Sequence, residues 1–195
     1  MFKTQTNKFL QLFGIVFLLA SFSFAQDERE WKSFAPNSGE WSIAAPGEMI
    51  PDAEAQESAS EMGSYSYTDA VGFYAVIYRD TPKGRVLWGP LKKSHFKRVR
   101  KDFIKSNRGE LIKDEKFSNG TYAGREVYIK VADGRVMDRE GPFKTKYRVQ
   151  RLRMFFDGRR FYLLLAVLPE KEINSPAVNN YFDSFILRQP QIANK

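Results

Sequence analysis

The sequence predicts an α+β fold in which helices pack on an antiparallel β-sheet. Short apolar or alternating segments recur along most of the chain and are separated by Gly, Pro, Asn and Asp, which is the pattern of strands joined by turns. Only two segments have the spacing of an amphipathic helix. Several strands around two helices favour α+β packing over alternating β and α units.

The strand pattern also predicts two hairpins. Phe73–Tyr78 is apolar on both faces, which is typical of a central strand. Asp157-Gly158 separates two long apolar segments and predicts one hairpin, and Asn119-Gly120 predicts another. Because the apolar phase changes between Val149 and Leu152, we expect a β-bulge there. The clear strands are expected at 41–45, 64–68, 73–78, 127–131, 147–156, 161–168 and 184–187.

One long helix is predicted from Pro90 to about Ser106. Gly89-Pro90 suits a helix start, because proline is favoured at the first helical position, and Gly109 suits the end. The apolar face of this helix consists of Leu91, His95, Val99 and Phe103, with Phe96 beside them. A shorter helix is expected from Ser175-Pro176, with its apolar residues turned toward the sheet.

Residues 1–25 have the three parts of a secretory signal peptide. Lys3 and Lys8 precede an uncharged apolar segment from Phe9 to Phe24, and Ser23 and Ala25 place small residues where signal peptidase cleaves. The alternative is an uncleaved anchor, but 16 residues are fewer than the roughly 20 that span a bilayer. We therefore expect an exported chain whose residues 26–195 form a single domain without a membrane span. Since it lacks cysteine, a bacterial periplasmic or secreted protein is favoured.

Four short segments resemble a recurring pattern in exported bacterial proteins. They are Phe34–Gly47, Tyr122–Val127, the hairpin around Gly158, and Tyr181–Phe185. The pattern is similar to that of the PsbP and DcrB group and extends over residues 34–187. The resemblance implies an α/β/α sandwich around an antiparallel sheet and an exported location. It implies no catalytic residue, because that group has no agreed catalytic motif to match in this chain.

The composition excludes several classes of chemistry. The chain has no cysteine and one histidine, so zinc–thiolate sites and thiol catalysis are excluded, and only His95 is available as the base of a Ser-His-Asp triad. His95 is expected to be a packed residue of the helix. Lys and Arg outnumber Asp and Glu by 31 to 23, for a net charge of +8, yet no nucleic-acid-binding motif is present. We expect no metal, no cofactor and no nucleic-acid partner, and a binding role is favoured over an enzymatic one.

The predicted long helix carries a ridge of lysines. These are Lys93, Lys97, Lys101 and Lys105, four residues apart, and Arg98 and Arg100 widen the patch. Like charges at this spacing destabilise a helix by about 0.2–0.5 kcal/mol per pair, so a purely structural helix has reason to avoid them. We interpret the patch as a surface for an anionic partner. The alternative interpretation is a solvated face that aids solubility. The hypothesis that follows is an exported, non-enzymatic envelope domain that binds a protein or an anionic surface.

Tyrosines on two predicted strands indicate an alternative function. Tyr65, Tyr67, Tyr74 and Tyr78 are candidates to line an aromatic cleft, in a small-ligand carrier or in an enzyme of unfamiliar chemistry. A closed and packed sheet at these positions would argue against such a cleft.

Three further charged groups have mainly structural interpretations. Basic residues around the Asp157-Gly158 hairpin either bind an anion or occupy exposed strand positions; they are Lys144, Lys146, Arg148, Arg151, Arg153, Arg159 and Arg160. The acidic segment from Glu48 to Glu61 matches no EF-hand loop. Glu126, Asp138 and Glu140 are candidate paired carboxylates, but no specific pattern supports them.

Overall fold

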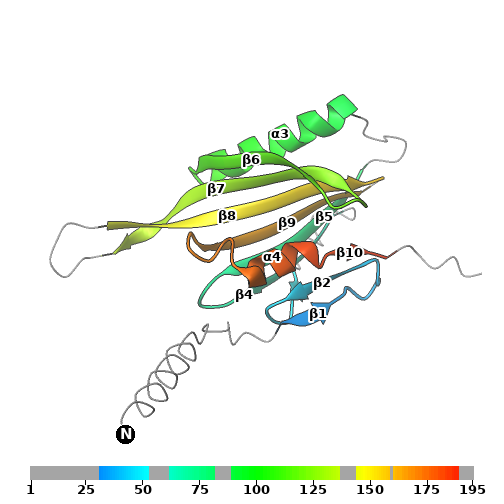
Figure 1. The fold of residues 1–195 in the computed structure, drawn as a ribbon, viewed down its shortest axis with the longest axis horizontal. Helices are drawn as coiled ribbons and strands as arrows, with labels where there is room; N and C mark the ends of the chain where they lie inside the picture. The colour runs from blue at the N-terminus through cyan, green and yellow to red at the C-terminus, as the bar shows by residue number, and fades with distance from the viewer. Residues whose placement is uncertain (1–30, 53–61, 82–88, 137–143, 159, 189–195) are drawn as a thin grey trace, which may run out of the picture. The chain divides into compact units, whose positions relative to one another are not determined.

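A seven-stranded antiparallel sheet is the frame of the computed structural model, which describes residues 31–52, 62–81, 89–136, 144–158 and 160–188 (Figure 1). Its strand order is β3-β4-β5-β9-β8-β7-β6. In that order the strands are β3 (Ile50–Pro51), β4 (Met62–Thr68), β5 (Phe73–Asp80), β9 (Arg160–Pro169), β8 (Lys144–Asp157), β7 (Ala123–Val136) and β6 (Glu110–Ser118). The predicted signal peptide lies outside the described residues.

Two different layers cover the faces of this sheet. One face is covered by α3 (Gly89–Ser106). The other is covered by α4 (Pro176–Asp183) and a small antiparallel sheet in the order β1-β2-β10, made of β1 (Lys32–Phe34), β2 (Trp41–Ala45) and β10 (Ile186–Leu187). The arrangement confirms the predicted α+β class with helices packed on an antiparallel sheet. Within the described ranges, no helix is both long and apolar enough to cross a membrane.

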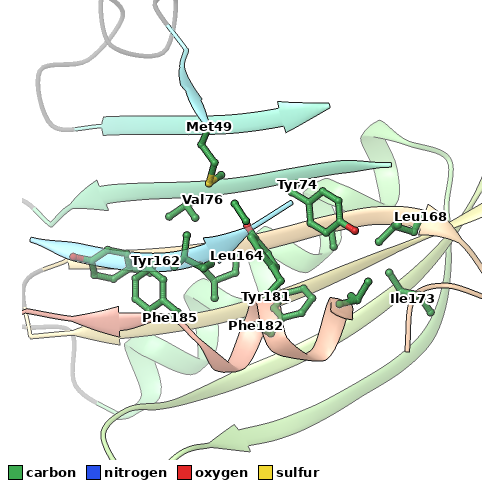
Figure 2. Close-up of a cluster of buried hydrophobic side chains, with 14 of the residues drawn as sticks. Met49, Tyr74, Val76, Tyr162, Leu164, Leu168, Ile173, Tyr181, Phe182 and Phe185 are labelled. Atoms are coloured by element: carbon green, nitrogen blue, oxygen red, sulfur yellow. The ribbon is translucent and has the colours of Figure 1, made fainter. Parts of the chain in front are cut away.

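The core between the large sheet and α4 consists mainly of aromatic side chains, several of which appear in Figure 2. The ring centroid of Phe155 lies 4.1 Å from that of Tyr122 and 5.4 Å from that of Tyr162. Phe185 packs against Phe155 at 5.5 Å and against Trp41 at 5.7 Å. The buried Tyr122 hydroxyl donates a 2.6 Å hydrogen bond to the carbonyl of Phe185. This core joins β2, β8 and β9 to the C-terminal segment.

The core under α3 is less enclosed. Phe96, Val99, Phe103 and Ile104 of the helix pack against apolar side chains of the sheet such as Leu152. Every residue of α3 is described, and none of them is fully buried. The helix is therefore the more loosely held of the two outer layers.

The structure confirms the predicted helices and most of the predicted strands, and it extends several of them. The strand predicted at 184–187 is limited to Ile186–Leu187, because Ser184 still caps the C-terminus of α4. The helix predicted from Pro90 begins one residue earlier, and Ser175 caps α4 by accepting a 3.4 Å hydrogen bond from the Val178 amide. The predicted turn residues Gly120 and Gly158 have φ angles of 88° and 51°, which glycine tolerates best. β6 extends well beyond the short segment that its turn predicts. Most of its residues are exposed and many are charged, so the sequence shows no apolar alternation that would reveal the rest of the strand.

The prediction of a β-bulge between Val149 and Leu152 is wrong. β8 pairs without interruption with both β7 and β9 through this segment. The apolar phase changes because Arg151 and Arg153 occupy buried positions on the α4 side of the strand. The register shifts of the described sheet lie in the β6–β7 and β7–β8 pairs, away from this segment.

Candidate anion-binding site

A cavity of about 700 Å³ lies between α3 and the strands β6, β7 and β8. Small-molecule sites have volumes of roughly 300–1,000 Å³, so this cavity has the size of a ligand site. The N-terminal part of α3 forms one wall, and residues on both sides of the β6–β7 turn contribute to the other. The lining residues are Gly89, Lys92, Lys93, Phe96, Lys97, Arg100, Asp114, Lys116, Ala123, Gly124, Arg125, Val127 and Met154.

The lining of the cavity is strongly basic. Six cations contribute to it: Lys92, Lys93, Lys97 and Arg100 from α3, Lys116 from β6, and Arg125 from β7. Among these described lining residues Asp114 is the single acid, which leaves a formal charge of +5. Among the described residues, no carboxylate lies within ion-pair distance of Lys93, Lys97 or Lys116. The lysine charges therefore face solvent and the cavity without compensation from the described part of the chain.

Asp114 is fully engaged with two of the cations. Arg100 donates to its Oδ2 atom, and Arg125 Nε donates to its Oδ1 atom over 2.8 Å. The carboxylate is only 14% exposed, and the bridge links α3 to β6 and β7. Because both carboxylate oxygens are occupied by arginines, Asp114 is not available to neutralise the lysines.

Apolar side chains complete the lining, and we call Phe96, Val127 and Met154 together the apolar floor. Val127 and Met154 are buried in the sheet, whereas Phe96 is half-buried and its ring lies 5.5 Å from that of Phe156. At Gly124 the strands β7 and β8 approach closely, since a Cβ atom there would lie 1.8 Å from the Met154 carbonyl oxygen. The cavity therefore combines a cationic rim with apolar surface.

The structure places only part of the predicted lysine ridge at this cavity. Lys93, Lys97 and Arg100 line it. Lys101 and Lys105 are exposed farther along α3 and do not contribute to the lining, and neither does the exposed Arg98. The ridge as a binding surface stays a prediction.

Two cations of the cavity, Lys116 and Arg125, are missed by reasoning from the sequence. Arg125 alternates in phase with Val127 and Ile129, whose side chains pack in the core under α3. Because Arg125 shares the strand face of these two residues, the sequence pattern itself places this cation beneath the helix. Lys116 has no such signal, because β6 is too polar to show a clear apolar phase.

The four tyrosines of the predicted cleft pack in or against the aromatic core, where Figure 2 shows Tyr74. None of the four lines the cavity described above. Tyr74 is fully buried, with its ring centroid 5.2 Å from that of Tyr181. Tyr65, Tyr67 and Tyr78 are partly buried against the same core. Burial raises the pKa of Tyr78, and the nearby Tyr65 adds to the effect. A ligand cleft at these positions stays a prediction.

Two of the hairpin arginines, Arg151 and Arg153, are buried in an ion network. Glu126 accepts a 3.0 Å hydrogen bond from Arg151 Nε on one oxygen and a 2.7 Å bond from Arg153 Nε on the other. The Tyr128 hydroxyl also donates to Glu126, over 2.9 Å. Burial raises the pKa of the Glu126 carboxyl, but the two arginines outweigh burial and hold that pKa below its ordinary value. Arg153 also donates a 2.8 Å hydrogen bond to Asp183 of α4, so each arginine has a carboxylate partner, which favours a structural role over an anion site.

The other predicted charged groups are dispersed. Arg160 pairs with Asp80 and Glu40, and Arg148 pairs with Asp133. Most of the acidic segment lies outside the described residues, as do Arg159, Asp138, Glu140 and the side chain of Lys144.

His95 is a packed residue of α3, as the sequence predicts. Its ring lies 5.3 Å from that of Phe156 and 4.6 Å from that of Phe161. Burial lowers its pKa, and the charges of Arg98 and Arg79 lower it further. Within the described ranges, no group of three His, Cys, Asp or Glu residues is placed to hold a metal ion.

Comparison with known proteins finds a likeness in structure. No family model and no curated protein matches the sequence. Cyanobacterial PsbP from Synechocystis superposes on this chain with a TM-score of 0.55 at 11% sequence identity, covering 84% of this chain and 96% of the other. The fold is PsbP-like.

Two further solved structures are less similar to this chain. A protein from Bacteroides thetaiotaomicron has 13% identity and a TM-score of 0.41, covering 82% of this chain and 49% of its own. The Ran-binding protein Mog1p from Saccharomyces cerevisiae has 10% identity and a TM-score of 0.46, covering 82% of this chain and 96% of its own.

The segments that resemble the PsbP group supply core residues of the PsbP-like fold. Trp41, Tyr122, Tyr181 and Phe182 from these segments are all buried in the aromatic core. Of the six cations at the cavity, only Arg125 lies in one of the segments. The PsbP-like fold therefore accounts for the resemblance and assigns no function to the cavity.

Proposed function

We propose that this protein is an exported bacterial envelope domain that binds an anionic surface through the basic side of α3. The observation that carries the proposal is the set of uncompensated lysines on that helix. Lys93, Lys97, Lys101 and Lys105 are exposed, and none has a carboxylate partner among the described residues. The helix retains three repulsive i,i+4 pairs along this ridge, and a binding role explains why such pairs are kept.

The proposed export supplies the surroundings in which such a surface is useful. The pattern of residues 1–25 supports secretion. An exported bacterial protein meets anionic lipid head groups and acidic envelope proteins. Each lysine near an anionic membrane contributes about 1 kcal/mol of attraction, so four neighbouring lysines are enough for salt-sensitive binding.

We propose binding rather than catalysis because of the way the site's carboxylate is used. Asp114 is held by Arg100 and Arg125 on both of its oxygens. It is therefore poorly placed to serve as a general acid or base. The lysines have no described acid partner that would tune them for proton transfer.

Charge reversal of the ridge tests the proposal. The unaltered protein is expected to sediment with phosphatidylglycerol vesicles at low salt, but not with phosphatidylcholine vesicles. The bound fraction should fall near 1 M salt, where the Debye length is about 3 Å. Together, Lys93→Glu, Lys97→Glu, Lys101→Glu and Lys105→Glu should abolish sedimentation while leaving the circular dichroism spectrum unchanged.

A matched control separates the effect of the lysine ridge from the effect of the protein's net charge. Lys113→Glu, Lys130→Glu, Lys146→Glu and Lys171→Glu together change the net charge equally at positions outside α3. This variant should keep most of the binding. Equal losses in the two variants, or undiminished binding by the ridge variant, would contradict the proposal. Salt-sensitive binding to a soluble envelope extract without binding to vesicles would identify an acidic protein as the partner.

A further inference from the structure

We infer that the cavity under α3 binds one anionic amphiphile, a molecule with a phosphate or carboxylate group and an apolar chain. The inference rests on the proposed function, because both use cations of α3. It adds a ligand that enters the fold between the helix and the sheet.

The cations of the cavity come from two layers of the fold. Lys93 and Lys97 belong to the helix, and Lys116 belongs to β6. An anion between the layers is therefore approached by positive charge from both sides. Electrostatic attraction is stronger in such a partly enclosed space than on an open surface, because less water screens it.

An unused hydrogen-bond donor points to the same ligand class. Arg100 lines the cavity, and its buried Nε–H has no acceptor among the described residues, although its other arm donates to Asp114. Buried donors are nearly always paired in native proteins. A phosphate or carboxylate oxygen is an acceptor that this donor lacks, and a shift of the Arg100 side chain toward the cavity would bring the buried Nε within its reach.

The apolar floor explains why the ligand should be more than a simple anion. Phe96, Val127 and Met154 contribute apolar surface that a hydrated inorganic ion does not use. An alkyl chain that covers this surface displaces water from it, which is favourable. It also completes the packing of α3, a helix in which no residue is fully buried.

Calorimetric titration with octyl phosphate below its micelle concentration tests the inference. Inorganic phosphate and octyl glucoside are the matched probes, since each carries only one half of the proposed ligand. We expect one octyl phosphate per chain, bound at least tenfold more tightly than either half. Shortening the chain should weaken binding by up to about fourfold for each methylene that is fully buried.

Two paired variants locate the site. Lys93→Gln with Lys97→Gln removes two cations that line the cavity, whereas Lys101→Gln with Lys105→Gln removes two from the same ridge outside it. The first pair should weaken octyl phosphate binding at least tenfold, and the second less than threefold. The helix and the change in net charge are the same in both pairs, so a difference between them reports the cavity.

Several results would overturn the inference. They are absence of octyl phosphate binding, equal binding of inorganic phosphate or of octyl glucoside, and equal losses in the two paired variants. Vesicle binding without octyl phosphate binding would overturn this inference alone. Octyl phosphate binding without anionic-surface binding would overturn the proposed function and retain the cavity. If the cavity pair releases the protein from phosphatidylglycerol vesicles and the Lys101 and Lys105 pair does not, the ligand is a lipid head group with part of its chain. If both pairs weaken vesicle binding equally, the ligand is a free amphiphile.

Discussion

At the scale of single residues, loss of the Glu126 carboxylate should strongly destabilise the fold. It lies between Arg151 and Arg153, and all three residues are about 5% exposed. Arg151 also donates a 2.6 Å hydrogen bond to the Asn179 side chain of α4. Arg153 in turn donates to Asp183 of α4 over 2.8 Å. The Glu126 carboxylate therefore compensates Arg151 and shares Arg153 with Asp183, and the two arginines hold α4 on the sheet.

Replacing Glu126 by Gln is expected to lower the free energy of unfolding by about 3–5 kcal/mol. The change leaves the buried Arg151 without a carboxylate partner among the described residues, and it leaves Arg153 with the mostly exposed Asp183. Urea denaturation measures this change. The matched control is Glu115→Gln: Glu115 pairs with Glu126 in the β6–β7 register but is 45% exposed, and its single ion pair within the described residues is with Lys113. That exposed pair is worth less than about 1 kcal/mol. Similar losses in both variants would contradict a special role for Glu126.

The difference in stability between the unaltered protein and Glu126→Gln should depend on pH. The pKa of Glu126 is lower in the folded chain than its ordinary value of 4.5. A carboxyl with a depressed folded pKa contributes stability above its unfolded pKa and loses that contribution as the pH falls through the folded pKa. The stability difference between the unaltered protein and Glu126→Gln should be constant near neutral pH and shrink below about pH 4.5. A difference that grows in acid would reverse this sign.

At the scale of elements, α3 is the more weakly held of the two described helices, since α4 buries Val178, Tyr181 and Phe182. No residue of α3 is fully buried, and its lysine ridge repels itself. Elements with few buried contacts open locally at a lower free energy than the core. The amides of α3 should therefore exchange with solvent faster than those of β8 and β9.

Lys101→Glu should slow that exchange. The new carboxylate would attract Lys97 and Lys105, so two repulsive pairs become attractive ones, with a total gain of about 1 kcal/mol in the stability of the helix. Hydrogen exchange of the α3 amides measures it. Lys101→Gln, which removes repulsion without adding attraction, should give about half the gain. Unchanged exchange in both variants would show that ridge repulsion does not govern the opening of α3.

Sequence patterns predict these elements well where one face is apolar and poorly where charges enter the core. The apolar face of α3 is periodic, so the helix and three of its cavity cations, Lys93, Lys97 and Arg100, were predictable. In β8 the apolar period is interrupted by Arg151 and Arg153, which pack in the core because Glu126 from another strand compensates them. A pattern along one strand contains no information about that partner. Of the cations that the sheet adds to the cavity, Lys116 was missed because β6 is too polar to show an apolar phase, whereas the apolar phase of β7 does place Arg125 beneath α3.

At the scale of the whole molecule, the two faces of the large sheet are stabilised unequally. The α4 side has an aromatic core around Phe155, whose ring stacks on Tyr122 and Tyr162 and meets Phe185 edge-on. The α3 side contains a cavity and only half-buried helix residues such as Phe96. A layer that is not fully packed can bind or release a ligand in its cavity, or move slightly, while the sheet and the other layer stay folded.

This inequality predicts different costs for two phenylalanine truncations. Phe155→Ala empties a fully enclosed site and should lower the free energy of unfolding by about 3–5 kcal/mol. Phe96→Ala removes a half-buried ring beside an existing cavity and should cost about 1–2 kcal/mol, since only part of its surface leaves water on folding. Urea denaturation compares them, and Phe96→Ala should also weaken octyl phosphate binding. Equal costs, or a Phe96→Ala protein that binds the amphiphile as tightly as before, would mean that the α3 layer is as closed as the other and that its apolar floor is not exposed to a ligand.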